Sequence, residues 1–140
     1  MTRAEALERF RLFYDTFSPA WIERLEELYA PTFVLSDPFH TLTDLGSLRG
    51  YLRRMLDSLA YTQFHVEDIA TGADGSYVRW RWEWQRTKRD KRRVVPGVTH
   101  LRFADDHRIT YHRDLFDAAE GFYEAIPVIG SALRAIKRRL

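Results

Sequence analysis

The sequence contains no cysteine, so disulfide bridges, thiolate catalysis and cysteine-ligated zinc are all excluded. It also lacks repeats, low-complexity segments and recognisable linkers. The N-terminus, MTRAEALERF, has no signal-peptide-like apolar stretch, and no run approaches the roughly 20 apolar residues needed to cross a bilayer. We therefore expect a cytoplasmic protein without a membrane span.

The composition is that of a globular protein, with 45% hydrophobic and 14% aromatic residues. A length of 140 residues suits a single domain, 1–140, with one substantial core. The net charge is only +2. The excess of cations lies in residues 88–93 (KRDKRR), which read as a hairpin tip, and in Lys137, Arg138 and Arg139, at a helix end where cations suit the macrodipole.

Capping signals and apolar spacing predict the helices. Thr2 and Glu5 form a capping box, Ser18-Pro19 is a helix start, and Asp44 can cap a further helix. Apolar residues at helical spacing follow each of these signals. The expected helices are residues 3–16, a helix from Pro19 that ends before Pro31, and one from Asp44 to about Ala60.

Five strands are predicted: 33–37, 62–70, 76–87, 94–104 and 108–116, with a bulge at Pro96-Gly97. Asp117 and Glu120 can then cap a last helix, broken at Pro127 and Gly130. Residues 127–140 read as a basic amphipathic C-terminal helix. The order predicts an α+β fold whose long strands are antiparallel and curl around the helices.

The stretch VTHLRFADDHRITYHRDLFD (98–117) reads as a β-hairpin leading into a helix. A turn at Asp106-His107 places Thr99 opposite Asp114 and Leu101 opposite His112. Because side chains alternate along a strand, His112, Asp114 and Phe116 share one side. A histidine and a carboxylate among apolar neighbours suggest a binding or proton-transfer site.

The strand SYVRWRWEWQRT alternates in the same way. Val78, Trp80, Trp82 and Trp84 face one side, and Arg79, Arg81, Glu83 and Gln85 face the other. The tryptophans either fill the core or line a ligand cavity. Arginines and rings on opposite faces cannot form one base-stacking platform, which argues against nucleic-acid binding.

These motifs resemble the nuclear-transport-factor-two-like superfamily, which includes ketosteroid isomerases and SnoaL-like polyketide cyclases. The resemblance rests on FVLSDP (33–38), GSLRGYLRRML (46–56) and VTHLRFADDHRITYHRDLF (98–116), and covers roughly residues 2 to 117. It implies a cone-shaped fold, in which a curved mixed or antiparallel sheet wraps over the N-terminal helices. A pocket opening at the wide end is implied too, with the even-numbered tryptophans facing it.

The resemblance also implies site residues. Asp37, directly before a proline, matches the proton-shuttling aspartate of the isomerases. The I-x-E-H-W-D pattern of the cyclases meets Ile109 to Asp114, which implies that Asp114 is the acid/base carboxylate and His112 its neighbour. Tyr14 falls near the isomerases' oxyanion donor, although Phe13 can occupy the matching register. Thr99 stands where the isomerases have a second aspartate, and this argues against steroid isomerisation.

Three interpretations remain open: acid/base catalysis, ligand binding without turnover, and a purely structural His–Asp pair. The expected ligand is a compact, largely apolar carbonyl or hydroxyl compound, polyketide-like or steroid-like. Isomerisation, aldol closure and epoxide hydrolysis are all compatible with an Asp/His pair. No cofactor or metal is expected. The catalytic candidates are Asp37, His112 and Asp114, and the ligand-binding candidates are Tyr14, His40, Trp80, Trp82, Trp84, Thr99, Leu101 and Phe116.

The outer side of the sheet is expected to carry mixed charge and a tyrosine, which suits a symmetric homodimer contact of the kind that family members form. Its predicted members are Arg79, Arg81, Glu83, His100, Arg102, Tyr111 and Arg113. The basic C-terminal helix also permits docking on a membrane surface, for which one short helix of modest charge is weak support.

Overall fold

The computed structural model describes residues 1–123 and 126–140, which contain one curved, six-stranded sheet. The strands are β1 (Tyr29–Ser36), β2 (Thr41–Leu42), β3 (Tyr61–Gly72), β4 (Gly75–Gln85), β5 (Arg93–Phe103) and β6 (Ile109–Leu115). The helices are α1 (Arg3–Asp15), α2 (Pro19–Ile22), the 3₁₀ turn η1 (Leu25–Glu27), α3 (Leu45–Ser58), α4 (Ala118–Gly121) and α5 (Pro127–Arg139). None of these helices is long and apolar enough to cross a membrane.

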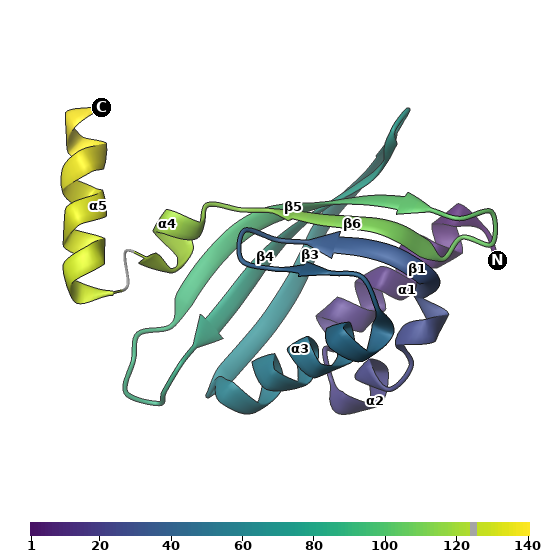
Figure 1. Cartoon of the computed structure of the whole chain (residues 1–140), viewed down its shortest axis with the longest axis horizontal. Helices are drawn as coiled ribbons and strands as arrows, with labels where there is room; N and C mark the ends of the chain where they lie inside the picture. Colours follow the sequence, from purple (N-terminus) through teal and green to yellow (C-terminus); the bar gives the residue numbers. More distant parts are fainter. Residues whose placement is uncertain (124–125) are drawn as a thin grey trace.

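The α+β architecture is confirmed. The strand order is β2-β1-β6-β5-β4-β3, with β3 to β6 antiparallel to their sequence neighbours and β1 parallel to β6. Figure 1 shows α1, α2 and α3 gathered on one side of the sheet, with α4 and α5 at the opposite end from the N-terminus. This arrangement leaves the concave side of the sheet facing the first three helices.

Two of the predicted helix starts are confirmed by side-chain caps. Thr2 Oγ1 accepts a hydrogen bond from the Glu5 amide, and the Glu5 carboxylate accepts one from the Thr2 amide. Asp44 accepts from the amide of Ser47 at the start of α3. These bonds satisfy amide groups that a helix N-terminus otherwise leaves unpaired.

The predicted second helix is wrong beyond Ile22. The chain makes a four-residue α2 and the short η1, and Tyr29 already belongs to β1. Tyr29 pairs with Ile109 of β6, whose amide donates to the carbonyl of Leu28 at 2.7 Å. A short helix has little intrinsic stability, so sheet pairing decides the conformation here.

The bulge predicted at Pro96-Gly97 is also wrong. Pro96 pairs with Arg81 and Gly97 with Trp80 in an unbroken β4–β5 register. Gly97 is needed for another reason: a Cβ there would lie 2.3 Å from the Trp80 ring. The glycine therefore lets a buried indole lie directly against the neighbouring strand.

The predicted hairpin register is confirmed, because Thr99 pairs with Asp114 and Leu101 with His112. Asp117 then caps α4 by accepting from the Glu120 amide. Gly130 does not break the last helix but lies within α5, which begins at Pro127. Residues 124–125, which belong to the predicted last helix before its break at Pro127, lie outside the described residues.

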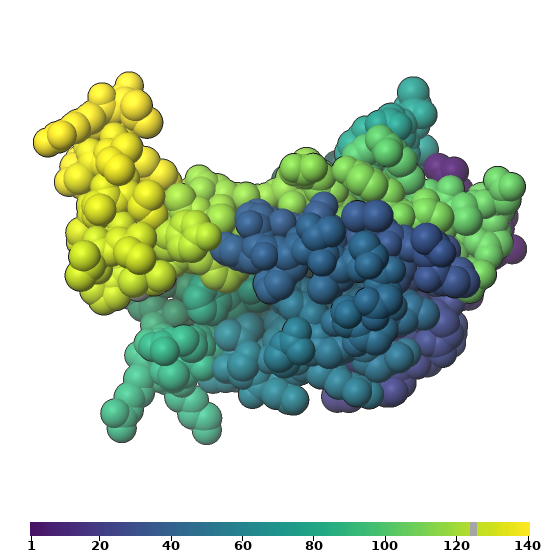
Figure 2. Space-filling model, viewed as in Figure 1, coloured from purple at the N-terminus to yellow at the C-terminus, as the bar shows by residue number. Residues whose placement is uncertain are grey.

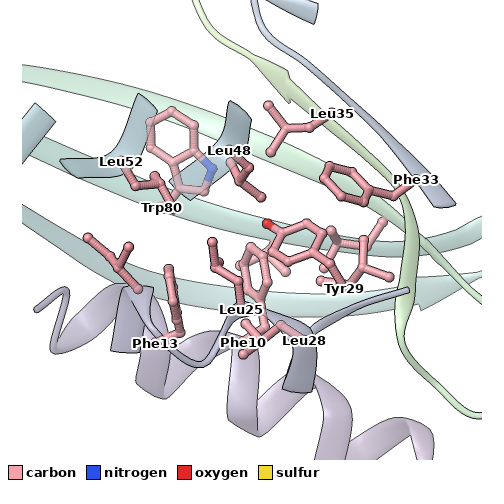
Figure 3. Close-up of a cluster of buried hydrophobic side chains, with 14 of the residues drawn as sticks. Phe10, Phe13, Leu25, Leu28, Tyr29, Phe33, Leu35, Leu48, Leu52 and Trp80 are labelled. Carbon is pink, nitrogen blue, oxygen red and sulfur yellow. The ribbon is translucent and has the colours of Figure 1, made fainter. Parts of the chain in front are cut away.

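The core fills the space between the sheet and the first three helices. Figure 3 shows Phe10 and Phe13 of α1, Leu48 and Leu52 of α3, and Trp80 of β4 converging on one cluster. All five are buried, as is Tyr29 at the start of β1. Phe10, Leu52 and Trp80 of this cluster also line a cavity.

Candidate active site

A cavity of about 180 Å³ lies between the inner face of the sheet and helices α1 and α3. Its wall is mostly aromatic and aliphatic, with two carboxylates, one histidine, one threonine and two tyrosine hydroxyls. The lining residues are Phe10, Tyr14, Leu35, Asp37, Phe39, His40, Tyr51, Leu52, Met55, Phe64, Val66, Trp80, Trp82, Thr99, Asp114, Phe116 and Phe122.

Asp114 of β6 is held by two side chains, those of His112 and Thr99. Its Oδ1 lies 2.8 Å from Nε2 of His112 and accepts a 2.5 Å hydrogen bond from the Thr99 hydroxyl. Within the described chain, these two contacts to Oδ1 are the only hydrogen bonds of the side chain, which is 24% exposed. The carboxylate is therefore held by one oxygen, and Oδ2 has no hydrogen-bond partner among the described residues.

Thr99 has a fixed hydrogen-bond direction. Its Oγ1 accepts from Nε1 of Trp80 at 2.8 Å, and an indole N–H can only donate. The threonine's own hydrogen is thus available for Asp114. The chain Trp80 to Thr99 to Asp114 is a directed sequence of donors that ends on the carboxylate.

His112 lies behind Asp114, with its side chain only 1% exposed. Nδ1 is 2.8 Å from the hydroxyl of Tyr29, whose oxygen is 3.3 Å from that of Tyr14. When Nε2–H donates to the Asp114 carboxylate, neutral His112 accepts at Nδ1 from Tyr29, and Tyr29 accepts from Tyr14. If His112 is doubly protonated, Nδ1–H donates to the Tyr29 hydroxyl, and Tyr29 in turn donates to the Tyr14 oxygen. The Tyr14 hydrogen is then available to the cavity.

Asp37 follows β1 and is held differently. Its Oδ1 accepts from the amides of Phe39 and His40, both at 2.7 Å, and its Oδ2 accepts from the Tyr51 hydroxyl at 3.0 Å. His40 Nδ1 lies 3.2 Å from the same Oδ1. These bonds tie the carboxylate into the turn between β1 and β2.

Burial keeps the two cavity-lining tyrosines protonated. It is the main cause that raises the pKa of Tyr14 well above its usual value, with smaller effects from Tyr29 and Asp114. Burial likewise raises the pKa of Tyr51, followed by the nearby Asp37 carboxylate. Both phenols therefore remain hydrogen-bond donors at neutral pH.

The structure brings most of the predicted site residues together. Those that line the cavity are Asp37, Asp114, Tyr14, His40, Trp80, Trp82, Thr99 and Phe116. His112 does not line the cavity but is linked to it through Asp114 and, by way of Tyr29, through Tyr14. Leu101 is fully buried in the core. Trp84 lies outside the cavity wall, against Trp82 and the ring of Phe122.

Sequence reasoning missed Tyr29, Tyr51 and Phe122. Tyr29 was assigned to the apolar stripe of a helix, whereas as the first residue of β1 it reaches His112. Tyr51 lies on the predicted third helix, and its spacing from the apolar residues gave no reason to single it out. Only the fold places it against Asp37.

No metal centre is formed by the part of the chain that the structure describes, where no cluster of three or more histidine and acidic side chains could hold an ion. The arrangement instead offers a carboxylate oriented by two donors beside an apolar cavity. The carboxylate can accept a proton or a hydrogen bond from a ligand held against the aromatic wall.

The family model described as the SnoaL-like domain matches residues 10–112. No curated protein sequence matches the chain with significance. The match runs from Phe10 within α1 to His112 within β6, and it includes α2, α3 and strands β1 to β5. The match thereby includes most of the residues that surround the cavity.

Solved structures show the same fold at low sequence identity. A hypothetical protein with a ketosteroid isomerase-like fold from Catenulispora acidiphila DSM 44928, in complex with trimethylamine, aligns with a TM-score of 0.72 and 16% identity, over 86% of this chain and 91% of that chain. A putative SnoaL-like polyketide cyclase from Jannaschia sp. CCS1 aligns with a TM-score of 0.68 and 15% identity, over 82% and 85%. AclR, a putative hydroxylase from Streptomyces galilaeus, aligns with a TM-score of 0.65 and 15% identity, over 92% and 96%.

Proposed function

The chain belongs to the SnoaL-like domain family, and we propose that it binds a compact, largely apolar carbonyl or hydroxyl compound and performs acid/base chemistry on it. The observation that carries the proposal is the Asp114 carboxylate, which lines an aromatic cavity while His112 and Thr99 hold one of its oxygens. The putative polyketide cyclase among the structural neighbours is consistent with a ligand of this class.

The size of the cavity limits the ligand. Its volume of about 180 Å³ slightly exceeds the roughly 150 Å³ of an engineered cavity that binds benzene, and lies below the ~300–1,000 Å³ of drug-sized sites. A ligand of one or two rings fits this space, whereas a four-ring steroid would extend beyond it. We therefore favour a polyketide-like ring over a steroid.

Asp114 is our proposed proton acceptor. A carboxylate beside an apolar ring system is only partly solvated, and its Oδ2 is the oxygen directed to no other described group. Removal of a proton next to a ligand carbonyl would place negative charge on the carbonyl oxygen. The Tyr14 hydroxyl, which lines the same cavity, can donate to that oxygen when His112 is doubly protonated and the Tyr14–Tyr29 bond is reversed.

Asp37 is better suited to a positioning role. Its carboxylate already accepts two backbone amides and the Tyr51 hydroxyl, so taking up a proton would weaken bonds that shape the β1–β2 turn. We propose that Asp37 and His40 order the rim of the cavity. Trp80, Trp82 and Phe116 would supply the apolar contact surface.

The experiment follows proton exchange and binding separately. The protein is incubated in D₂O with 1-tetralone, a two-ring ketone, and loss of its α-proton signal is measured by NMR, while 2-naphthol fluorescence reports binding. We expect Asp114→Asn to abolish exchange and preserve naphthol binding, and Asp37→Asn to retain exchange. Naphthol binding without exchange in the native protein would favour a non-catalytic binding module. Absence of both would contradict the proposal.

We also propose a homodimer that uses the outer face of the sheet. This face carries ion pairs in which Glu67 lies between Arg79 and Arg81, and a stack of Tyr77 on His100. Tyr111 contacts the His100 ring and extends this surface onto β6. Sedimentation equilibrium should show a dimer that Tyr111→Asp dissociates, and a monomeric native protein would exclude this assembly.

A further inference from the structure

Helix α5 projects from one end of the molecule. Figures 1 and 2 show it beside α4, beyond the end of the sheet, with one long side turned away from the body. It is joined to the fold by the ion pair of Lys137 with Asp117 at 3.7 Å and by the buried Gly130. A thirteen-residue helix is thus held in place while most of its surface remains exposed.

The exposed surface of α5 includes an apolar stripe. Ile129 and Ile136 are seven residues apart and share one face of the helix, Leu140 follows Ile136 by four residues, and Val128 flanks Ile129. Val128 is 81% exposed, Ile136 57% and Ile129 49%. Exposed apolar side chains gathered on one helix face indicate a surface that contacts something less polar than water.

The charged side chains of α5 are all cationic. Residues 127–140 contain Arg134, Lys137, Arg138 and Arg139 and no acidic residue. The loop between β4 and β5 carries the second basic cluster, KRDKRR at 88–93, and it reaches the same end of the molecule in Figure 1. Positive charge is therefore concentrated where the apolar stripe is exposed.

We propose that α5 docks this end of the protein on an anionic lipid bilayer. The helix would lie in the interface with its apolar stripe among the acyl chains and its cations at the lipid phosphates. An anionic bilayer is favoured because its charge is complementary to the cations of α5 and its acyl chains to the apolar stripe. A second copy of α5 would bring four more cations against the first four, and a nucleic acid would leave the apolar stripe exposed.

The docked end adjoins the mouth of the cavity. Phe39 and Phe122 both line the cavity, with ring centroids 5.0 Å apart, and Phe39 also contacts Tyr123 at 5.9 Å. Phe39 and Tyr123 are exposed at this rim, as is Ile126 immediately before α5. An apolar surface thus extends from the cavity towards the helix, which would let an apolar ligand enter from the bilayer side.

Vesicle flotation of the full chain tests the proposal. We expect the protein to float with vesicles of equal parts phosphatidylcholine and phosphatidylglycerol and to remain below vesicles of phosphatidylcholine alone. Raising NaCl from about 0.1 M to about 1 M should weaken flotation, because salt screens the attraction. Ile129→Asp with Ile136→Asp should abolish it, and Arg138→Glu with Arg139→Glu should lower the partition coefficient by at least roughly tenfold.

The matched control is Arg53→Glu with Arg54→Glu, an adjacent exposed pair on α3 that changes the net charge equally. It should float as the native protein does, and thermal melting should show that all variants fold. Absence of flotation would overturn the proposal, as would an equal loss in the control. A concentration-dependent dimer abolished by Ile136→Asp, without flotation, would identify a second copy as the occupant. Duplex DNA binding that needs Arg138 but not Ile136 would overturn it too.

Discussion

The hydroxyl of Tyr29 and Nδ1 of His112 lie 2.8 Å apart, between neighbouring parallel strands. Both residues are fully buried, so each provides the hydrogen bond that water would otherwise make to the other. The contact joins the cavity carboxylate, through His112, to Tyr14 on α1. The first residue of β1, which was expected to belong to a helix, thereby supplies the link between the carboxylate and α1.

Tyr29→Phe should lower the free energy of unfolding by about 1–3 kcal/mol, because it leaves the buried Nδ1 of His112 without a donor. Tyr14→Phe removes only the longer 3.3 Å contact and should cost less, about 0.5–1.5 kcal/mol. Urea denaturation measures both. Equal losses of unfolding free energy in the two variants would show that the Tyr29–His112 bond stabilises the fold no more than the Tyr14–Tyr29 contact does.

Thr99→Val should destabilise the protein by about 1–3 kcal/mol, since the buried indole N–H of Trp80 loses its acceptor and Asp114 a donor. Thr99→Ser keeps the hydroxyl and should recover most of this loss. Ligand affinity in the two variants, measured by naphthol titration, should follow the same order. A valine variant as stable as the native protein would contradict the directed donor chain.

Gly97→Ala should displace the Trp80 ring, because the new methyl would lie 2.3 Å from it. Overpacking of this kind costs about 1–3 kcal/mol and should shift the tryptophan emission spectrum. Gly50→Ala, where the nearest atom is the flexible end of Arg54 at 3.3 Å, is the control. It lies within α3 and should be neutral or stabilising by up to about 1 kcal/mol.

Alkaline pH should destabilise the fold through its buried tyrosines. Burial raises the pKa of Tyr51 above its usual value of 10.0, so above that pH the unfolded chain loses a proton that the folded chain keeps. Its contribution is fully present below pH 10.0 and is lost as pH rises further. Tyr51→Phe should reduce the slope of stability against pH by up to about 1.4 kcal/mol per unit in this range. Urea midpoints between pH 8 and about 11 measure it, and an unchanged slope would refute the shift.

The features that short-range sequence signals predicted correctly are the helix caps, the alternation of strand side chains and the hairpin pairing. The capping residues Thr2 and Asp44, the alternation of Trp80 and Trp82, and the pairing of Thr99 with Asp114 all follow from hydrogen-bond geometry within a few residues or from the period of a strand. The family resemblance is confirmed because these signals occur in the order that the fold requires.

The errors lie where distant segments compete with local preference. Leu25 to Leu28 have helical spacing, yet pairing with β6 extends the chain from Tyr29. Pro96-Gly97 looks like a bulge, yet the glycine serves the Trp80 ring from the next strand. In both places the deciding partner is remote in sequence, so no window of residues contains it.

The sequence by itself determined the parity of the β-hairpin, and with it that Asp114 and His112 point to the same side, because strand geometry has a period of two. Only the tertiary structure decided that Asp114 reaches the cavity while His112 lies behind it, joined to Tyr29 and Tyr14. Whether a strand residue lines the cavity or lies behind its lining depends on how the helices pack across the curved sheet. That packing is a property of the whole chain.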